Sequence, residues 1–401
     1  MGYTMRVRPP GSARRIPDPF PEGFTRMLGR RDDALAQPFK GVTADGTLQA
    51  GLFPIRETGV STQPIVDAAN AFLAALPPEM RARGQFPLDS DEWRTWVNAE
   101  HYILRNGLPG MDAMDDSQRE AAFNLMRSTL SDRGFELSRK IMQLNGFMGD
   151  LSNNHEDLDK WLYFFKVFGT PSTTEPWGWQ IDGHHLIVNC FVLGDQVVMS
   201  PVFMGAEPTI ADRGPLKGMR SFDEETQAGL ELIRSLTPQQ QDKAVLFRSI
   251  LSTDLPPERY DRGDGRHRGG AFKDNLILPY EGLRGDEMTA DQQQKLLDLA
   301  EVYIGRMRPG HDRVRMQEIE QHLGDTYFAW MGGFSEGAVF YYKVHSPVVL
   351  IEFDHHRGVF LDVDEPVPFH IHTIVRTPNG NDYGKDLLRQ HLELFHKGER
   401  R

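Results

Sequence analysis

Two histidine-rich stretches contain the side chains of this sequence that are best suited to chemistry. Seven of the 14 histidines lie in residues 177–189 and 355–391, namely His184, His185, His355, His356, His370, His372 and His391. Imidazole is the only side chain whose unperturbed pKa lies between pH 5 and 8, and it is the commonest metal ligand. The two stretches therefore indicate a functional site, and a metal centre in particular, without specifying the reaction.

His370 and His372 are two residues apart in a segment typical of a β-strand. Side chains at i and i+2 point to the same face of a strand, so both imidazoles can reach one ion. A polar pair at the surface or in the core is the alternative. His184 and His185 are adjacent, so we expect only one of them to face a given site, unless a bulge at Gly183 turns both toward it.

The remaining histidines and the cysteine have simpler interpretations. His355 and His356 lie between Asp354 and Arg357, a polar stretch that predicts an exposed hairpin turn. His391 falls in a helical pattern, as a cap or an interior polar residue. Cys190 lies in an apolar run, which favours a small buried hydrophobic side chain over a nucleophile.

A loop with candidate functional residues follows the His-x-His strand. Pro378 and Gly380 predict a tight loop that holds Arg376, Asp382 and Tyr383 near the strand end. Arg376 suits recognition of a substrate carboxylate, and Tyr383 could donate a proton. Asp382 could bind the metal, act as general base, orient an imidazole or cap the final helix.

Other candidates lie elsewhere in the chain. Glu207 is an alternative to Asp382 as carboxylate ligand or general base. Residues 262–275, a basic glycine-rich loop, could cradle an anionic substrate or be a solvated mobile loop. Trp177 and Trp179 could wall a pocket or belong to the core. The candidate substrate-binding residues are Arg376, Trp177, Trp179, Gln180 and Arg268.

The pattern of apolar residues predicts the elements that must position these side chains. Helices are expected within 62–150 and at 223–236, 238–252, 290–307 and 387–395; strands are expected at 161–168, 185–193, 196–203, 338–344, 348–353, 359–363 and 370–375. This order predicts an α+β fold, with a helical N-terminal half packed on a largely antiparallel sheet formed by the central hairpin and the C-terminal strands. Residues 1–40, rich in Pro and Arg, are expected to be extended, and residues 41–401 to form a single domain. No internal repeat is visible.

Composition excludes several classes of partner. The chain has 45 basic and 57 acidic residues and a net charge of −12, which disfavours nonspecific binding to nucleic acid or to an anionic membrane. It contains no run of about 18 apolar residues that would span a membrane. The single cysteine fits a reducing compartment, so a cytoplasmic protein is expected. The sequence is compatible with a homo-oligomer.

Several motifs together resemble the family catalogued as domain of unknown function 3500. They are residues 38–46, 58–62 and 92–98, the stretch from Trp179 to His185, and the stretch from His370 through Arg376 to Gly384. The resemblance covers most of the chain. It implies that the Gly-His-His and His-Ile-His stretches are the shared ones, rather than His355-His356, and it supplies no ligand set.

The leading hypothesis is a metal-dependent enzyme that acts on a small, anionic organic substrate. His184 or His185 would join His370 and His372 around one divalent ion. Zinc with three protein ligands and an open position would support hydrolysis, which we prefer, whereas iron or copper would support oxygen chemistry. The alternative is a metal-free small-molecule-binding protein with a polar histidine core.

Overall fold

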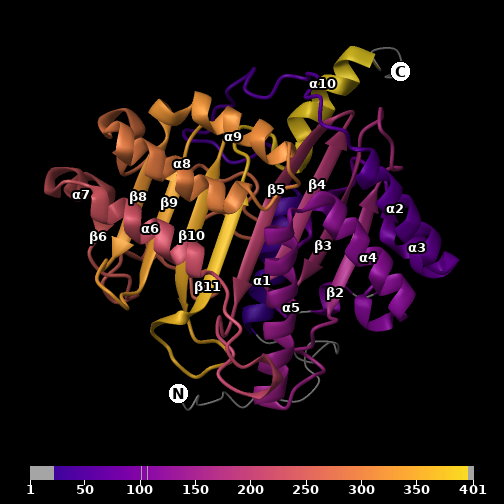
Figure 1. The fold of residues 1–401 in the computed structure, drawn as a ribbon, viewed down its shortest axis with the longest axis horizontal. Coiled ribbons are helices and arrows are strands. Elements are labelled where there is room, and N and C mark those ends of the chain that lie inside the picture. Colours follow the sequence, from indigo (N-terminus) through magenta and orange to yellow (C-terminus); the bar gives the residue numbers. More distant parts are fainter. Residues whose placement is uncertain (1–21, 101, 106, 396–401) are drawn as a thin grey trace.

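The computed structural model describes residues 22–100, 102–105 and 107–395, and an eleven-stranded sheet forms its centre (Figure 1). The strands are β1 (Gln85–Phe86), β2 (Tyr163–Phe168), β3 (Trp177–Gly183), β4 (Leu186–Leu193), β5 (Gln196–Ala206), β6 (Val245–Phe247), β7 (Leu283–Arg284), β8 (Tyr327–Gly332), β9 (Phe340–His345), β10 (Leu350–Arg357) and β11 (Pro366–Arg376). They follow the order β1-β2-β3-β4-β5-β11-β10-β9-β8-β6, with β7 beside β8. Only β1–β2 and β6–β8 pair in parallel among these strands.

Helices make up the other layer of the fold. They are α1 (Glu22–Leu35), α2 (Gln63–Ala75), α3 (Pro78–Gly84), α4 (Asp116–Thr129), α5 (Asp132–Ser152), α6 (Asp223–Ser235), α7 (Pro238–Ala244), α8 (Ala290–Ile304), α9 (His311–Gln321) and α10 (Lys385–Phe395). The combination of these helices with a mostly antiparallel sheet confirms the α+β prediction. None of the helices in the described part combines the length and the apolar content needed to cross a membrane.

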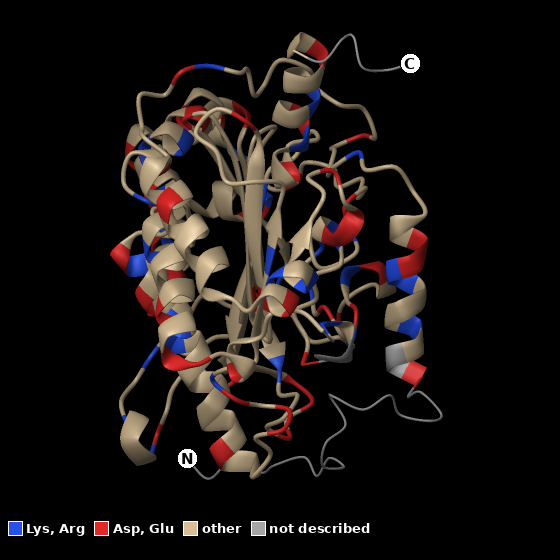
Figure 2. Ribbon diagram, turned by 90° about the vertical axis from the view of Figure 1, so that its right-hand side faces the viewer, with Lys and Arg blue, Asp and Glu red and all other residues tan. Residues whose placement is uncertain are grey.

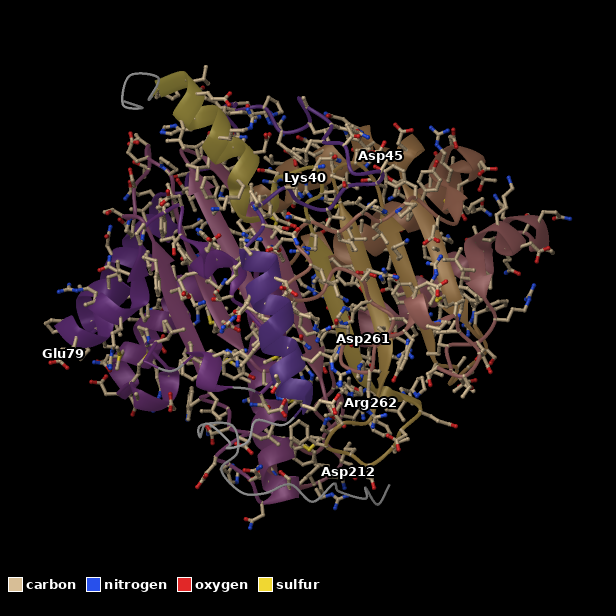
Figure 3. All side chains as sticks on the ribbon, turned by 180° about the vertical axis from the view of Figure 1, so that it is seen from behind. Lys40, Asp45, Glu79, Asp212, Asp261 and Arg262 are labelled. Carbon is tan, nitrogen blue, oxygen red and sulfur yellow. The ribbon has the colours of Figure 1, made fainter. Side chains whose placement is uncertain are left out.

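The two faces of the sheet are covered differently. Helices α2, α4, α5, α6, α8 and α9 lie on one face (Figures 1 and 2), whereas α1 and long loops lie on the other (Figure 3). Successive side chains of a strand point to opposite faces. In β11, Ile371 and Val375 therefore enter the main apolar core under the helices, and Ile374 enters a smaller core on the loop side. His370 and His372 share the loop side with Ile374.

The second half of the chain repeats the order of elements of the first half. The order α2, α3, β1, α4, α5, β2 to β5 is matched by α6, α7, β6, α8, α9, β8 to β11, with β7 as an addition. Equivalent helices even begin alike, because Asp115 with Gln118 and Thr289 with Gln292 form capping boxes at the starts of α4 and α8. The two halves meet where β5 pairs with β11. The expectation of no internal repeat was therefore wrong at the level of topology.

Three local predictions also differ from the structure. Helix α1 occupies Glu22–Leu35 and buries Met27, where an extended segment was expected; residues 1–21 lie outside the described residues. The helix expected at 238–252 ends at Ala244, because the chain continues as edge strand β6 beside β8. No strand forms at 359–363; instead β10 extends to Arg357.

Candidate metal centre

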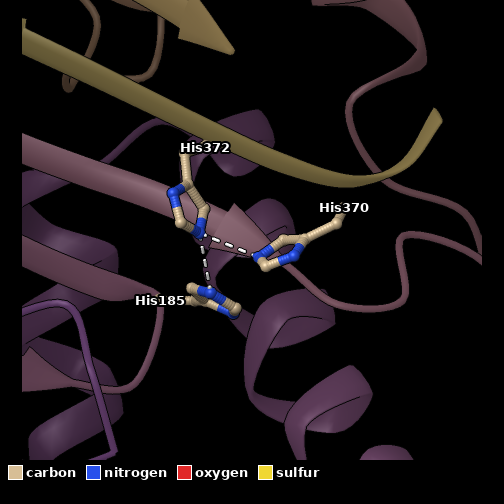
Figure 4. Close-up of side chains that lie close together, drawn as sticks. All are labelled: His185, His370 and His372. Carbon is tan, nitrogen blue, oxygen red and sulfur yellow. Dashed lines mark hydrogen bonds between the residues drawn. The ribbon is translucent and has the colours of Figure 1, made fainter. Parts of the chain in front are cut away.

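Three imidazoles bring their Nε2 atoms together on the loop side of the sheet (Figure 4). His372 Nε2 lies 3.0 Å from His185 Nε2 and 2.9 Å from His370 Nε2. Two nitrogens that each bind one ion at about 2.0–2.1 Å can be at most about 4.2 Å apart. Both measured separations meet this limit, and all three ligand atoms lie within 4.8 Å of one another. These three histidines are therefore the candidate metal ligands.

The backbone positions these rings from strand β11 and from the turn between β3 and β4. His370 and His372 point to one face of β11, as the spacing predicted. His185 lies in the tight turn between β3 and β4, where it adopts a left-handed φ of +62°. Gly205 of β5 pairs with His372, and a Cβ there would lie 3.0 Å from the His372 ring and 3.3 Å from the His185 ring. The absence of a side chain at Gly205 thus makes room for both rings.

His184 supports His185 and does not join the group of three. Its ring stacks on that of His185 at 3.9 Å, and its Nδ1 lies 2.7 Å from Asn145 Oδ1 of α5. The strand was expected to begin at His185, which would have put the two side chains on opposite faces. The strand begins instead at Leu186, so both histidines belong to the turn and their rings can lie together.

The protons of these rings cannot all be placed satisfactorily without a cation. His370 Nδ1 lies 2.6 Å from the carbonyl oxygen of Arg357. A carbonyl only accepts hydrogen bonds, so the neutral ring carries its proton on Nδ1 and leaves a lone pair on Nε2. His372 Nε2 faces this lone pair and His185 Nε2 as well, and one N–H cannot be directed at both. A cation that accepts three lone pairs removes this conflict, so the donor set fits a metal ion.

Burial keeps the three candidate ligands neutral. It lowers the pKa of His185, His370 and His372 well below the ordinary value of 6.5, and the neighbouring imidazoles lower it further. A histidine must be neutral to bind a metal. The centre is therefore in the form that binds metal at neutral pH.

We expect the free energy of unfolding of the metal-free protein to fall as the pH is lowered from 6.5 toward 4. Burial lowers the pKa of His355 and His356 to about 4, and that of His345 to about 3. In the unfolded chain each imidazole regains a pKa of about 6.5, so in this window the unfolded chain binds more protons, and each group contributes a slope of up to about 1.4 kcal/mol per pH unit.

Urea unfolding at about pH 7 and about pH 5 measures this slope. H345N should reduce this slope, because it removes one of the three imidazoles whose pKa is lowered by burial. Equal free energies of unfolding at the two pH values would contradict the expectation.

Glu207 lies at the outer side of the centre. Its carboxylate accepts hydrogen bonds from the backbone N–H groups of Val359, Phe360 and Leu361, and its Oε2 is 3.6 Å from His370 Nδ1. The carboxylate is thus beside Nδ1 and not beside Nε2. This placement suits a residue that orients His370, and differs from the role of ligand or general base considered from the sequence.

Arg376, Asp382 and Tyr383 form a separate buried cluster. Arg376 Nη2 is 2.5 Å from Asp274 Oδ1, and Arg376 Nε is 3.0 Å from Asp382 Oδ2. Tyr383 donates a hydrogen bond to Asp274, and Ser200 donates one to Asp382. The structure does not bring these three residues to the histidines. Both carboxylates facing Arg376 belong to the chain itself, so the arginine is already occupied.

The aromatic and amide candidates of β3 belong to the core. Trp177, Trp179 and Gln180 are fully buried. Trp177 donates its indole N–H to the carbonyl of Ser172, and Gln180 donates to Asn189 Oδ1 at 2.6 Å. The hydrogen-bond partners of Trp177 and Gln180 are thus internal, and the burial of Trp177 and Trp179 supports the core alternative for the two tryptophans.

The glycine-rich loop, residues 262–275, packs against the sheet (Figure 3 labels Arg262 at its start). Arg266 pairs with Asp354 of β10 at 2.5 Å, and the backbone N–H groups of Arg268 and Gly269 donate to the carboxylate of Glu352. The Arg268 guanidinium donates to the carbonyl of Glu258. Beyond its exposed start at Arg262 and Gly263, the loop is therefore packed rather than solvated, and the anion that it cradles is a side chain of the same protein.

Sequence reasoning missed two histidines beside the centre. His356 was expected in an exposed turn, but it is buried in β10, and its ring lies 4.6 Å from that of His372 and 4.8 Å from that of His370. His267 of the glycine-rich loop lies 5.7 Å from His372. Polar residues stand at every second position, Glu352, Asp354 and His356. This alternation was a signal that the strand continues with one polar face.

Comparison with known proteins identifies a family but no function. The family described as "Protein of unknown function (DUF3500)" matches residues 58–385. No curated protein and no solved structure matches the chain. The function must therefore be argued from the geometry of the site.

Proposed function

The chain belongs to the DUF3500 family, and we propose that it is a metal-dependent enzyme whose ion is bound by His185, His370 and His372. The observation that carries the proposal is the convergence of three neutral Nε2 atoms, with separations of 2.9 and 3.0 Å from His372. The fixed tautomer of His370 adds support, because a hydrogen bond from Nδ1–H to a carbonyl is the usual way in which a ligating histidine is oriented.

Three imidazoles are an established ligand set for catalytic zinc. Zinc would supply activation of a water molecule, whereas iron or copper in the same site would supply oxygen chemistry. For a centre with three ligands we propose hydrolysis. The contribution of the chain is to hold the three rings in place: the Arg357 carbonyl and Glu207 orient His370, and Gly205 leaves room for His185 and His372.

A small anionic organic molecule is the proposed substrate class. Three neutral imidazoles would leave both positive charges of a divalent ion uncompensated, and a buried uncompensated charge is costly. Arg376 contributes nothing to this preference, since Asp274 and Asp382 already pair with it. An anion bound at the ion would supply the missing charge.

Metal analysis of protein purified without a histidine tag tests the proposal. We expect about one equivalent of a transition metal per chain, or uptake of about one equivalent on titration with zinc, iron(II) or copper(II). Binding of less than about a tenth of an equivalent in both experiments would contradict it and would favour the metal-free binding protein with a polar histidine core.

A further inference from the structure

One backbone carbonyl orients two histidines of the cluster in the same way. The carbonyl oxygen of Arg357 lies 2.6 Å from His370 Nδ1 and 3.0 Å from His356 Nδ1. A carbonyl oxygen has two lone pairs and no proton, so it can accept both N–H groups. His356 therefore has the same tautomer as His370, with its proton on Nδ1 and a lone pair on Nε2.

The lone pair of His356 is otherwise unused. Its Nε2 is buried and has no hydrogen-bond partner among the described residues, and the whole residue is 1% exposed. An unsatisfied buried acceptor is uncommon and costs free energy unless a ligand or ion meets it. His356 thus has the same orienting contact and the same free nitrogen as a metal ligand.

The ring of His356 is about as close to the rings of His370 and His372 as those two rings are to each other. Its ring centroid is 4.6 Å from that of His372 and 4.8 Å from that of His370. The corresponding distances within the group of three are 4.6 Å for His370 and His372, and 5.0 Å for His185 and His372. No other element separates His356 from the pair on β11, because β10 and β11 are hydrogen-bonded neighbours.

We propose that His356 is a fourth imidazole ligand of the metal centre, supplied by β10 through its Nε2. The inference rests on the proposed ion site of His185, His370 and His372. Coordination requires His356 Nε2 to move toward the other three nitrogens, because it is not part of the group whose atoms all lie within 4.8 Å. This movement on metal binding is local, since the His356 ring already contacts the rings of His370 and His372.

His267 does not carry the same argument. Neither of its ring nitrogens has a hydrogen-bond partner among the described residues, so no hydrogen bond fixes its tautomer. Its ring is 5.7 Å from that of His372, and it comes from the glycine-rich loop rather than from the sheet. We therefore assign it no role as a ligand.

A fourth imidazole would change the choice between the two reaction classes. Zinc with four protein ligands is usually tetrahedral and closed, which is the arrangement of structural sites. An enzyme built on four imidazoles needs an ion that accepts five or six ligands, so that a position stays open for the substrate. Iron and copper meet this requirement, and oxygen chemistry would then replace hydrolysis as the preferred class.

The test is to count imidazoles at the ion and to remove His356. X-ray absorption of the wild-type protein loaded with zinc, and separately with copper(II), should show four imidazoles. H356Q should show three and should bind each metal at least about 10-fold more weakly in competition with a chelator, because even the loss of outer partners of ligands costs about 10–100-fold. The matched control H345Q replaces a buried histidine of β9 and should change neither result.

The outcomes separate the two proposals. A wild-type protein that binds no metal overturns the ion site itself. A wild-type protein with three imidazoles, together with unchanged affinity in H356Q, overturns the role of His356 and leaves the three-histidine site intact. If H356Q does not fold, the count on the wild-type protein still decides.

Discussion

Replacement of His372 by alanine is expected to weaken metal binding by more than about 100-fold, because loss of a ligand should exceed the 10–100-fold cost of losing an outer partner. His372 is the residue that contacts both other ligands, at 3.0 Å and 2.9 Å. Its removal should leave His185 and His370 without a shared neighbour. Metal content after equilibrium dialysis against a buffered concentration of zinc measures the effect.

The fold of the H372A protein distinguishes a metal site from a structural core. His372 Nδ1 has no hydrogen-bond partner among the described residues, so its loss removes an unsatisfied group as well as a ring. We therefore expect an unchanged far-UV circular dichroism spectrum. The control H345A also removes a buried histidine and should retain the metal. Unfolding of H372A, with no metal bound by the wild-type protein, would favour a structural role.

Replacement of Arg376 by methionine is expected to lower the free energy of unfolding by about 3–5 kcal/mol, the usual cost of removing one partner of a buried ion pair. Arg376 is fully buried, and its guanidinium lies beside Asp274 and Asp382. Burial already raises the pKa of Asp382 above its ordinary value, although the attraction of Arg376 opposes this shift. Without the arginine, a buried carboxylate would have to remain unpaired or take up a proton.

Urea unfolding of R376M and of a matched surface variant measures this cost. Arg389 of α10 pairs with Asp386 and Glu393 but is 55% exposed, so R389M should cost less than about 1 kcal/mol. An R376M protein as stable as the wild type would contradict the structural role. That result would favour a role for Arg376 in substrate binding, which its spacing from the His-x-His motif had suggested.

The parts of the fold that the sequence predicted are those governed by local patterns. Apolar periodicity identified α2, α4 and α8, and the Gly194-Asp195 turn identified the hairpin of β4 and β5. Helix α1 was missed because its stability comes from contact with the rest of the protein, where Met27 joins the loop-side core. The edge strand β6 was missed for a similar reason, since it is defined by pairing with β8, about 80 residues later.

The candidate site was predicted where one strand determines it and missed where two distant segments do. The spacing of His370 and His372 was sufficient to place both on one face. His356 could not be placed, because Asp354, His356 and Arg357 read as an exposed polar turn when taken alone. Asp354 and His356 are in fact buried, and Arg266, from a loop 88 residues earlier in the chain, neutralises Asp354. That pairing depends on tertiary structure.

The meeting of the two sheet halves along β5 and β11 has a consequence for the lifetime of the protein. His185 belongs to the first half, whereas His370 and His372 belong to the second. His372 follows His185 by 187 residues in the sequence. An ion bound by all three would hold the halves together. When the free ion concentration is 1,000 times the dissociation constant, binding would add about 4 kcal/mol against their separation. The supply of metal would then control how often the chain opens to proteases, and so how long each copy survives.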